Sequence, residues 1–190
     1  MNLLTIISYF IYAFIFLKLG ILIFEKLNKF LENEIFNRRL ELGILSIQDL
    51  YKFGFDKFLS LSEVYLKDLG FTNITTASID YKNVDFTCEF KGEKVYVQCI
   101  LDNIVDVKNG DEEIYSIGRP KVQKMLGQMV HDGVKYGIII TNGCCSNESL
   151  DFAEHQDGEH KVLLVDGYHF TKGIRTLKES KKFLGDALYE

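Results

Sequence analysis

The sequence lacks the short motifs that identify several large enzyme classes. It contains no Walker-type phosphate loop, no dinucleotide-binding glycine fingerprint, no G-x-S-x-G nucleophile turn and no H-E-x-x-H zinc motif. The sequence therefore gives no motif support for a P-loop nucleotide hydrolase, a dinucleotide-binding enzyme, an α/β-hydrolase or a zinc metalloprotease. The chain also contains no internal repeat.

Cysteine and proline are scarce. The four cysteines do not show the spacing of a disulfide framework, which is typical of a protein in a reducing compartment. Two of them, Cys144 and Cys145, are adjacent, and adjacent cysteines chelate one metal ion poorly, so they do not predict a zinc site. The single proline, Pro120, excludes a proline-rich linker.

Positive charge is also in short supply. The chain has 22 lysine and arginine residues against 27 aspartate and glutamate residues, a formal net charge of −5. A domain that binds nucleic acid mainly by nonspecific neutralisation of phosphates is normally basic. Any nucleic-acid binding by this chain must therefore come from a local basic patch.

The N-terminal segment, by contrast, is strongly apolar. Lys18 is the only charged residue between Leu3 and Phe24. At about 1.5 Å per residue, a helix over residues 3–24 covers roughly the 30 Å core of a bilayer. The sequence therefore predicts a transmembrane anchor over residues 1–24. A signal peptide is less suitable because no cleavage site follows, and a buried core helix would be unusually long.

Basic residues flank only the C-terminal side of this run. Lys26, Lys29, Arg38 and Arg39 follow it, and none precedes it. By the positive-inside rule, this places the C-terminal domain in the cytoplasm, so the expected location is the cell membrane with a single pass. Residues 25–45 keep a helical pattern and are expected to form a juxtamembrane stalk.

Helix and strand patterns alternate from residue 46 onward. Ser46-Ile47-Gln48-Asp49 resembles a capping box at the start of a helix. Further helices are expected over residues 56–69, 120–131 and 146–155, and strands over residues 73–79, 84–90, 94–100, 136–140 and 161–165. Residues 102–117 are polar and indicate a loop, and residues 175–190 indicate a charged tail. The pattern favours an α/β fold with a central mixed sheet flanked by helices in three layers.

A hairpin signal lies between two of these strands, at Lys91-Gly92-Glu93. If Lys91-Gly92 is a two-residue turn, Phe90 pairs with Glu93. Counting back along both strands then places Asp85 opposite Gln98, with Cβ atoms about 5 Å apart. A three-residue turn would shift this register.

Several motifs follow one another in a fixed order between about residues 50 and 170: Gly54–Phe58, Leu66–Phe71, Val84–Phe86, Val95–Cys99, Ile117–Gln123, Tyr136–Gly143, Leu150–Ala153 and Leu163–Gly167. This ordered set resembles the Mrr-type restriction endonuclease domain, which has the PD-(D/E)xK fold. The resemblance implies that residues 46–174 form a restriction-endonuclease-like domain. It also implies DNA as a partner.

The resemblance further implies a magnesium-dependent nuclease site. In such a site an acidic ligand lies on one strand, and a Glu or Gln ligand lies two residues before a lysine on the next. The resemblance assigns these catalytic positions to Asp85 and Gln98, and it places the metal at Asp85, Gln98 and Cys99. A small core residue is the plainer interpretation of Cys99, and a water-exposed hairpin residue is the plainer interpretation of Asp85.

Two positions depart from the family pattern. The lysine position is occupied by Ile100 and the first-helix glutamate position by Leu59, and residues 80–83 lack the family's acidic-glycine approach to the aspartate. Isoleucine neither donates a hydrogen bond nor offsets phosphate charge. We therefore expect hydrolysis to be lost or reduced, with Mg²⁺ as cofactor only if activity survives.

Basic residues near the start of the helix expected over residues 120–131 could contact a nucleic acid. Arg119, Lys121 and Lys124 are the candidates, and a solvated helix face is the alternative. Lys121 or Lys124 could also replace the missing lysine.

Three functions therefore remain open at this stage: a membrane-anchored, DNA-associated protein with weak or no hydrolysis, an active magnesium-dependent endonuclease with a relocated lysine, and a non-enzymatic, membrane-tethered interaction module. The sequence identifies neither a protein partner nor an oligomeric state.

Overall fold

The computed structural model describes residues 3–77, 83–102, 116–156 and 158–188. Two predictions therefore lie outside the described residues: the altered approach to Asp85 at residues 80–82, and the acidic part of the loop at residues 111–113. The chain divides into two compact units, Met1–Leu42 and Gly43–Glu190.

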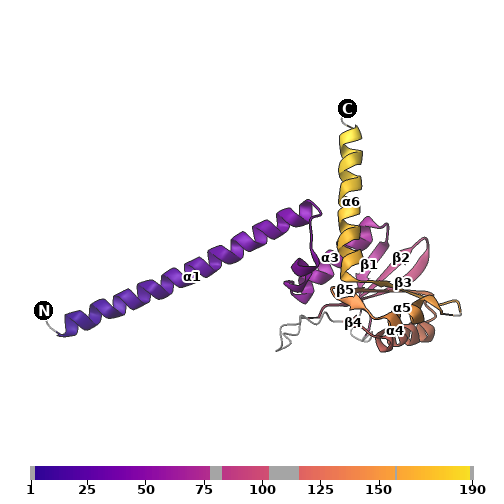
Figure 1. Cartoon of the computed structure of the whole chain (residues 1–190), viewed down its shortest axis with the longest axis horizontal. Coiled ribbons are helices and arrows are strands. Elements are labelled where there is room, and N and C mark those ends of the chain that lie inside the picture. The colour runs from indigo at the N-terminus through magenta and orange to yellow at the C-terminus, as the bar shows by residue number, and fades with distance from the viewer. Residues whose placement is uncertain (1–2, 78–82, 103–115, 157, 189–190) are drawn as a thin grey trace. The chain divides into compact units, whose positions relative to one another are not determined.

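The first unit is a single helix, α1 (Leu3–Glu41), drawn in indigo and purple in Figure 1. Its apolar part contains one charged residue, Lys18, and ends at Phe24, before Glu25 and Lys26.

No helix in the described part of the chain is long and apolar enough to cross a membrane. The predicted single-pass location in the cell membrane, with residues 3–24 as the anchor, is therefore wrong. The physical reason is charge, because Lys18 lies within the apolar part of α1 and Glu25 and Lys26 end it.

The second unit is built on a five-stranded sheet with the strand order β1-β2-β3-β5-β7. The first three strands are antiparallel, whereas β3, β5 and β7 are parallel, so the predicted mixed sheet is confirmed. The strands are β1 (Thr72–Thr76), β2 (Phe86–Phe90), β3 (Glu93–Ile100), β5 (Tyr136–Thr141) and β7 (Lys161–Val165). A separate short parallel pair, β4 (Ser116–Ile117) and β6 (Cys144–Cys145), was not predicted.

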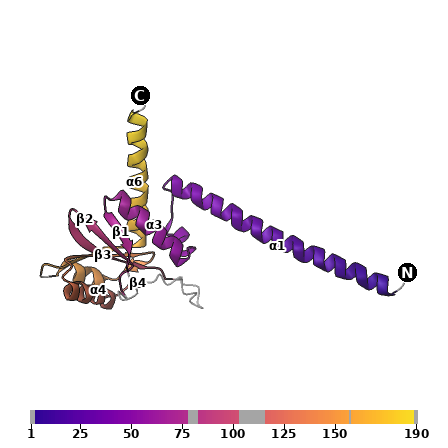
Figure 2. The same ribbon diagram turned by 180° about the vertical axis from the view of Figure 1, so that it is seen from behind.

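Helices cover both faces of this sheet (Figures 1 and 2). On one face, α3 (Phe55–Asp68) contacts β1 and β3, and α6 (Gly167–Leu188) contacts β5 and β7. On the other face, α4 (Arg119–Asp132) contacts β5 and β7, and α5 (Asn147–Glu154) contacts β7. The short helix α2 (Ile47–Tyr51) packs on α6. The predicted three-layer α/β architecture is therefore confirmed.

Each face of the sheet has its own apolar core. Beneath α4, Tyr96 and Ile100 of β3 join a buried cluster with Met125, Met129 and Ile139. Beneath α6, the ring of Phe170 meets that of Phe58 edge to face, with centroids 5.6 Å apart. Burial of these side chains on two faces, at roughly 25 cal/mol per Å² of apolar surface, supplies the main force that holds the three layers together.

The hairpin between β2 and β3 has the predicted register. Phe90 pairs with Glu93, and the ladder continues to Phe86 opposite Val97. Both turn residues have positive φ, 53° at Lys91 and 83° at Gly92. This is the two-residue turn whose twist matches that of the flanking strands.

Capping residues fix several helix starts. The Ser46 hydroxyl accepts a hydrogen bond from the amide of Asp49, and the Asp49 carboxylate accepts one from the amide of Ser46, so the predicted capping box is confirmed. Ser146 caps α5 in the same way, through the amide of Ser149. At the C-terminal end, residues 175–188, which were expected to form a charged tail, belong instead to α6, which begins at Gly167.

Candidate active site

Asp85 lies immediately before β2 and is tied to both neighbouring strands. Its amide donates to the carbonyl of Val97 at 2.8 Å, and its carbonyl accepts from the amide of Ala77 at 2.9 Å. Its side-chain Oδ2 accepts from the amide of Cys99 at 2.7 Å. The side chain of Asp85 is therefore held against β3 by a charge-assisted hydrogen bond.

The regular ladder of the hairpin stops one residue short of the predicted pair of Asp85 with Gln98. The last regular pair is Phe86 with Val97, so Asp85 is one residue beyond it on the side of Gln98. The amide of Asp85 bonds to Val97, however, so the ladder is distorted at this point. The carboxylate of Asp85 meets the peptide group that joins Gln98 to Cys99. Gln98 is half-buried in β3.

The Asp85 carboxylate lacks a counter-ion in the described part of the chain. Burial raises its pKa above the ordinary value, and the hydrogen bond from the Cys99 amide opposes this shift without cancelling it. No salt bridge to Asp85 is found among the described residues. A partly desolvated carboxylate without a cation is the kind of group that a metal ion would stabilise.

The two positions that depart from the family pattern belong to packed apolar surfaces. Ile100 is the last residue of β3, is only 9% exposed and packs in the cluster with Val84 and Met125. Leu59 is half-buried in α3. An aliphatic side chain thus occupies the position that the family resemblance assigned to lysine.

The side chain of Cys99 is buried, and only its backbone amide contributes to the candidate site. Burial is the main cause that raises the pKa of its thiol, to about 12, so the sulfur stays protonated near neutral pH. A protonated thiol is a poor metal ligand. The backbone amide of Cys99 donates its hydrogen bond to the carboxylate of Asp85.

The oxygen ligands that the family resemblance predicts at this point are the carboxylate of Asp85 and the side-chain amide of Gln98. Among the described residues, no group of three or more His, Cys, Asp or Glu side chains is placed to hold a metal ion. Mg²⁺ is commonly held by one or two carboxylates, with water and phosphate oxygens completing its shell. The single carboxylate of Asp85, with water and phosphate oxygens, fits a weakly held Mg²⁺, and Gln98 as a second ligand stays a prediction.

The candidate basic residues lie at the start of α4. Arg119, Lys121 and Lys124 are exposed. The guanidinium of Arg119 lies 4.7 Å from the centroid of the Phe152 ring, which holds it against α5.

The start of α4 is tied to the C-terminal ends of the parallel strands. It follows β4, which pairs with β6 just beyond the end of β5. Arg119, Lys121 and Lys124 therefore belong to a helix that begins at the end of the sheet where Ile100 lies.

A buried asparagine that the sequence analysis did not single out organises this end of the sheet. The side chain of Asn142 exchanges two hydrogen bonds with the backbone of Asp102, at 3.0 and 2.7 Å. It thereby holds the chain that leaves β3, just beyond Ile100, against the end of β5. The sequence signal for this role of Asn142 was a polar residue directly after a buried strand. The same pattern is also typical of a simple turn.

One protein family and two solved structures are similar to this chain. Residues 50–174 match the Mrr catalytic-domain family, whose description is restriction endonuclease. A protein of unknown function, AF1548, has a crystal structure with a TM-score of 0.43 and 20% identity, over 70% of this chain and 67% of that chain. The MspJI restriction endonuclease in complex with a 27-mer oligonucleotide gives a TM-score of 0.47 and 16% identity, over 70% of this chain and 31% of that chain.

No curated protein sequence matches the chain. The family match covers most of the chain and nearly all of the sheet and helices around Asp85. The chain therefore belongs to the Mrr-type restriction endonuclease family.

Proposed function

We propose that this protein is a DNA-associated member of the Mrr family whose phosphodiester hydrolysis is lost or strongly reduced. The observation that carries the proposal is Ile100, which occupies the lysine position and packs into the core beneath α4. Hydrolysis of a phosphodiester needs stabilisation of negative charge as it develops, and an isoleucine supplies neither charge nor a hydrogen-bond donor.

The remaining polar groups support binding better than turnover. Bound Mg²⁺ would polarise a phosphate and lower the pKa of a water molecule. Asp85 and Gln98 would hold the ion, and the Cys99 amide would fix the orientation of the Asp85 carboxylate. Without a cationic side chain at position 100, the attacking water is not oriented from that side.

DNA association is assigned to the start of α4. The chain carries a net charge of −5, so binding must be local. The side chains of Arg119, Lys121 and Lys124 are exposed on one short stretch of helix. Lysine and arginine contacts to phosphate position a protein on DNA without reading its sequence.

The test is a plasmid-nicking assay on the full chain with Mg²⁺ or Mn²⁺. We expect no nicking by the wild-type protein. We expect Ile100→Lys to gain nicking, because Asp85 and Gln98 remain in place, and Ile100→Met to stay inactive as the control of similar volume. Asp85→Ala in the Ile100→Lys background should abolish the gained activity.

Two results would contradict the proposal in different ways. Nicking by the wild-type protein that disappears in Asp85→Ala would favour the active endonuclease, and the same loss in Lys121→Ala or Lys124→Ala would identify a relocated lysine. Absence of salt-dependent DNA binding would instead favour a non-enzymatic interaction module.

A further inference from the structure

The helices α4 and α5 pack against each other, and both start at the short strand pair β4 and β6. α4 begins two residues after β4, and α5 begins two residues after β6. The amide of Ser146 donates a hydrogen bond to the carbonyl of Ile117 at 3.0 Å, which ties the start of α5 to the end of β4. The first turns of the two helices are therefore held in a fixed relation to each other.

A ring on α5 lies against the first residue of α4. The guanidinium carbon of Arg119 is 4.7 Å from the centroid of the Phe152 ring. Phe152 is half-buried and packs on the apolar cluster beneath α4, which contains Val122 and Met125. Because the core holds Phe152, its ring gives the exposed guanidinium a fixed surface to rest on.

The neighbouring lysines have no such support. Lys121 and Lys124 are exposed, and neither forms a salt bridge or a ring contact within the described ranges. Arg119 likewise has no carboxylate partner there, and Asp151 of α5 pairs with His155 at 3.1 Å instead. The N–H groups of Arg119 thus remain available while the position of its guanidinium is restricted.

This arrangement suits a ligand that presents two acceptor atoms side by side. A guanidinium stays charged at all ordinary pH values, and its N–H donors form a planar fork that meets a phosphate in two parallel hydrogen bonds. The contact with the ring uses none of these donors. A long side chain normally loses rotamer freedom when it binds a ligand, and one that is already held loses less. The ring contact should therefore strengthen the binding of Arg119 to a phosphate.

Two parts of a DNA duplex offer such a pair of acceptors. One is a phosphate of the backbone, and the other is the O6 and N7 edge of guanine in the major groove. Lys121 and Lys124 lie on the same short stretch of helix as Arg119. Three cations together match the repeated charges of the backbone better than a single base edge, so phosphate is favoured.

We infer that Phe152 is a positioning residue for DNA binding, because it holds the guanidinium of Arg119 for a bidentate contact with a backbone phosphate. This inference rests on the proposed association with DNA. It adds an uncharged residue to the binding surface, at the place where α5 meets the start of α4.

The test is a double-mutant cycle on the full chain, with DNA affinity measured by fluorescence anisotropy on a short duplex at one salt concentration. We expect Arg119→Ala to weaken binding at least about tenfold, and Phe152→Leu to weaken it about two- to fivefold. Phe152→Tyr, which keeps the ring, should bind within about twofold of the wild type. In the Arg119→Ala background, Phe152→Leu should have no further effect, because no guanidinium is left to position.

Two further measurements test the phosphate contact itself. Arg119→Lys should weaken binding although it keeps the charge, because an ammonium group cannot form the planar fork. The loss caused by Arg119→Ala should be the same on a duplex of only A·T pairs as on a G·C-rich duplex, since both present the same phosphates.

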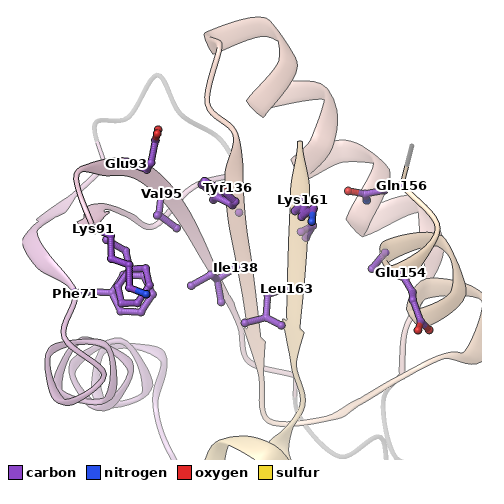
Figure 3. Close-up of a pocket in the computed structure, with 14 residues that line it drawn as sticks. Phe71, Lys91, Glu93, Val95, Tyr136, Ile138, Glu154, Gln156, Lys161 and Leu163 are labelled. Atoms are coloured by element: carbon purple, nitrogen blue, oxygen red, sulfur yellow. The ribbon is translucent and has the colours of Figure 1, made fainter. Parts of the chain in front are cut away.

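A matched control lies at the opposite end of the parallel strands, beside a cavity of about 590 Å³ (Figure 3). There the Nζ atom of Lys91 lies 5.3 Å from the centroid of the Phe90 ring, and this ring stacks on that of Phe71 with centroids 4.6 Å apart. Phe90→Leu removes a ring from beneath a cation as Phe152→Leu does, but at the other end of the sheet from the start of α4. It should leave DNA affinity unchanged.

Three results would overturn the inference while leaving DNA association intact. They are equal effects of Phe152→Leu in both backgrounds, wild-type affinity in Phe152→Leu or Arg119→Lys, and a loss in Arg119→Ala confined to the duplex that contains guanine. Equal effects would mean that Phe152 only stabilises the fold. Absence of any DNA binding by the wild-type chain would overturn the proposed association itself, and this inference with it.

Discussion

At the scale of single residues, Asp85 links the candidate site to the stability of the domain. Its pKa in the folded protein is raised, chiefly by burial, above the unfolded value of about 3.9. The ionised form is therefore penalised in the native state. The contribution of Asp85 to stability is fully present at pH values below its pKa in the unfolded chain. This contribution is lost as the pH rises through its pKa in the folded protein.

We accordingly expect Asp85→Asn to stabilise the protein at pH 7.5 by about 1 kcal/mol or less. The amide oxygen of asparagine can still accept the hydrogen bond from Cys99, and the desolvated charge is gone. Near pH 3 the Asp85 carboxyl is protonated in both the folded and the unfolded protein. The difference in stability between Asp85→Asn and the wild type should therefore vanish there. Urea unfolding at the two pH values measures this, with Glu159→Gln, an exposed residue, as the control. A loss of stability at pH 7.5 would show that the ionised carboxylate has a cationic partner.

The buried position of Ile100 gives a second prediction at this scale. Ile100→Lys should lower the free energy of unfolding by about 2 kcal/mol, because a charged side chain enters the cluster beneath α4. Ile100→Met should cost less than about 1.5 kcal/mol, since it conserves volume and remains apolar. Chemical denaturation of the two variants distinguishes them. Equal stabilities would mean that the lysine ammonium reaches water along its flexible stem.

At the scale of elements, the β2–β3 hairpin sets the register that brings Asp85 to β3. Lys91 occupies the first turn position with a φ of 53°, a conformation in which asparagine is far more common. We expect Lys91→Asn to stabilise the hairpin by about 0.5 kcal/mol and Gly92→Val to destabilise it by about 2 kcal/mol. Thermal unfolding of both variants provides the measurement. Stabilisation by Gly92→Val would contradict the two-residue turn.

The junction between β7 and α6 is equally constrained. A methyl group at Gly167 would lie 2.9 Å from the carbonyl carbon of Asn142, the residue whose side chain holds Asp102. Gly167→Ala should therefore cost about 1–3 kcal/mol through backbone collision. Gly127→Ala, on an open part of α4 with nothing within 4 Å, should instead gain up to about 1 kcal/mol. Both values come from denaturant midpoints, and equal effects would refute the packing argument.

Elements with strong local signals were predictable from the sequence. The Lys91-Gly92 turn, the Ser46–Asp49 capping box and the alternating strand runs act through neighbouring residues, so a linear pattern contains them. The start of α6 was missed, although the carboxylate of Asp166 accepts a hydrogen bond from the amide of His169 as a capping residue does. The pair β4 and β6 has two residues in each strand, too few for any periodicity to show.

At the scale of the whole molecule, the acidic balance of the chain constrains how it can bind DNA. Three basic residues at the start of α4 predict a weak salt dependence of DNA binding. A plot of the logarithm of DNA affinity against the logarithm of salt concentration should have a slope no steeper than roughly −3. Replacing Lys121 and Lys124 by alanine should lower this magnitude by about 2, whereas Lys172→Ala on α6 should leave it unchanged. Fluorescence anisotropy between about 50 and 200 mM salt measures the slopes. An unaltered slope in the double variant would remove these lysines from the DNA-binding surface.

Relations between distant segments were the least predictable part of the molecule. The pairing of Asn142 with Asp102 and the contact of Gly167 with the Asn142 backbone join three segments, and no local pattern encodes such contacts. The apolar character of the N-terminal helix was visible in the sequence, but its use as a membrane anchor was not correct. Apolar composition alone did not establish a membrane span.

The packing of residue 100 also has an evolutionary consequence. Once an aliphatic side chain at the end of β3 has been recruited into the core, neighbouring residues such as Val84 and Met125 come under selection to fit it. Each later adjustment to that shape makes a return to lysine more disruptive. Relatives that share this packing should therefore keep a branched or bulky apolar residue at the position of Ile100, even where Asp85 and Gln98 are replaced.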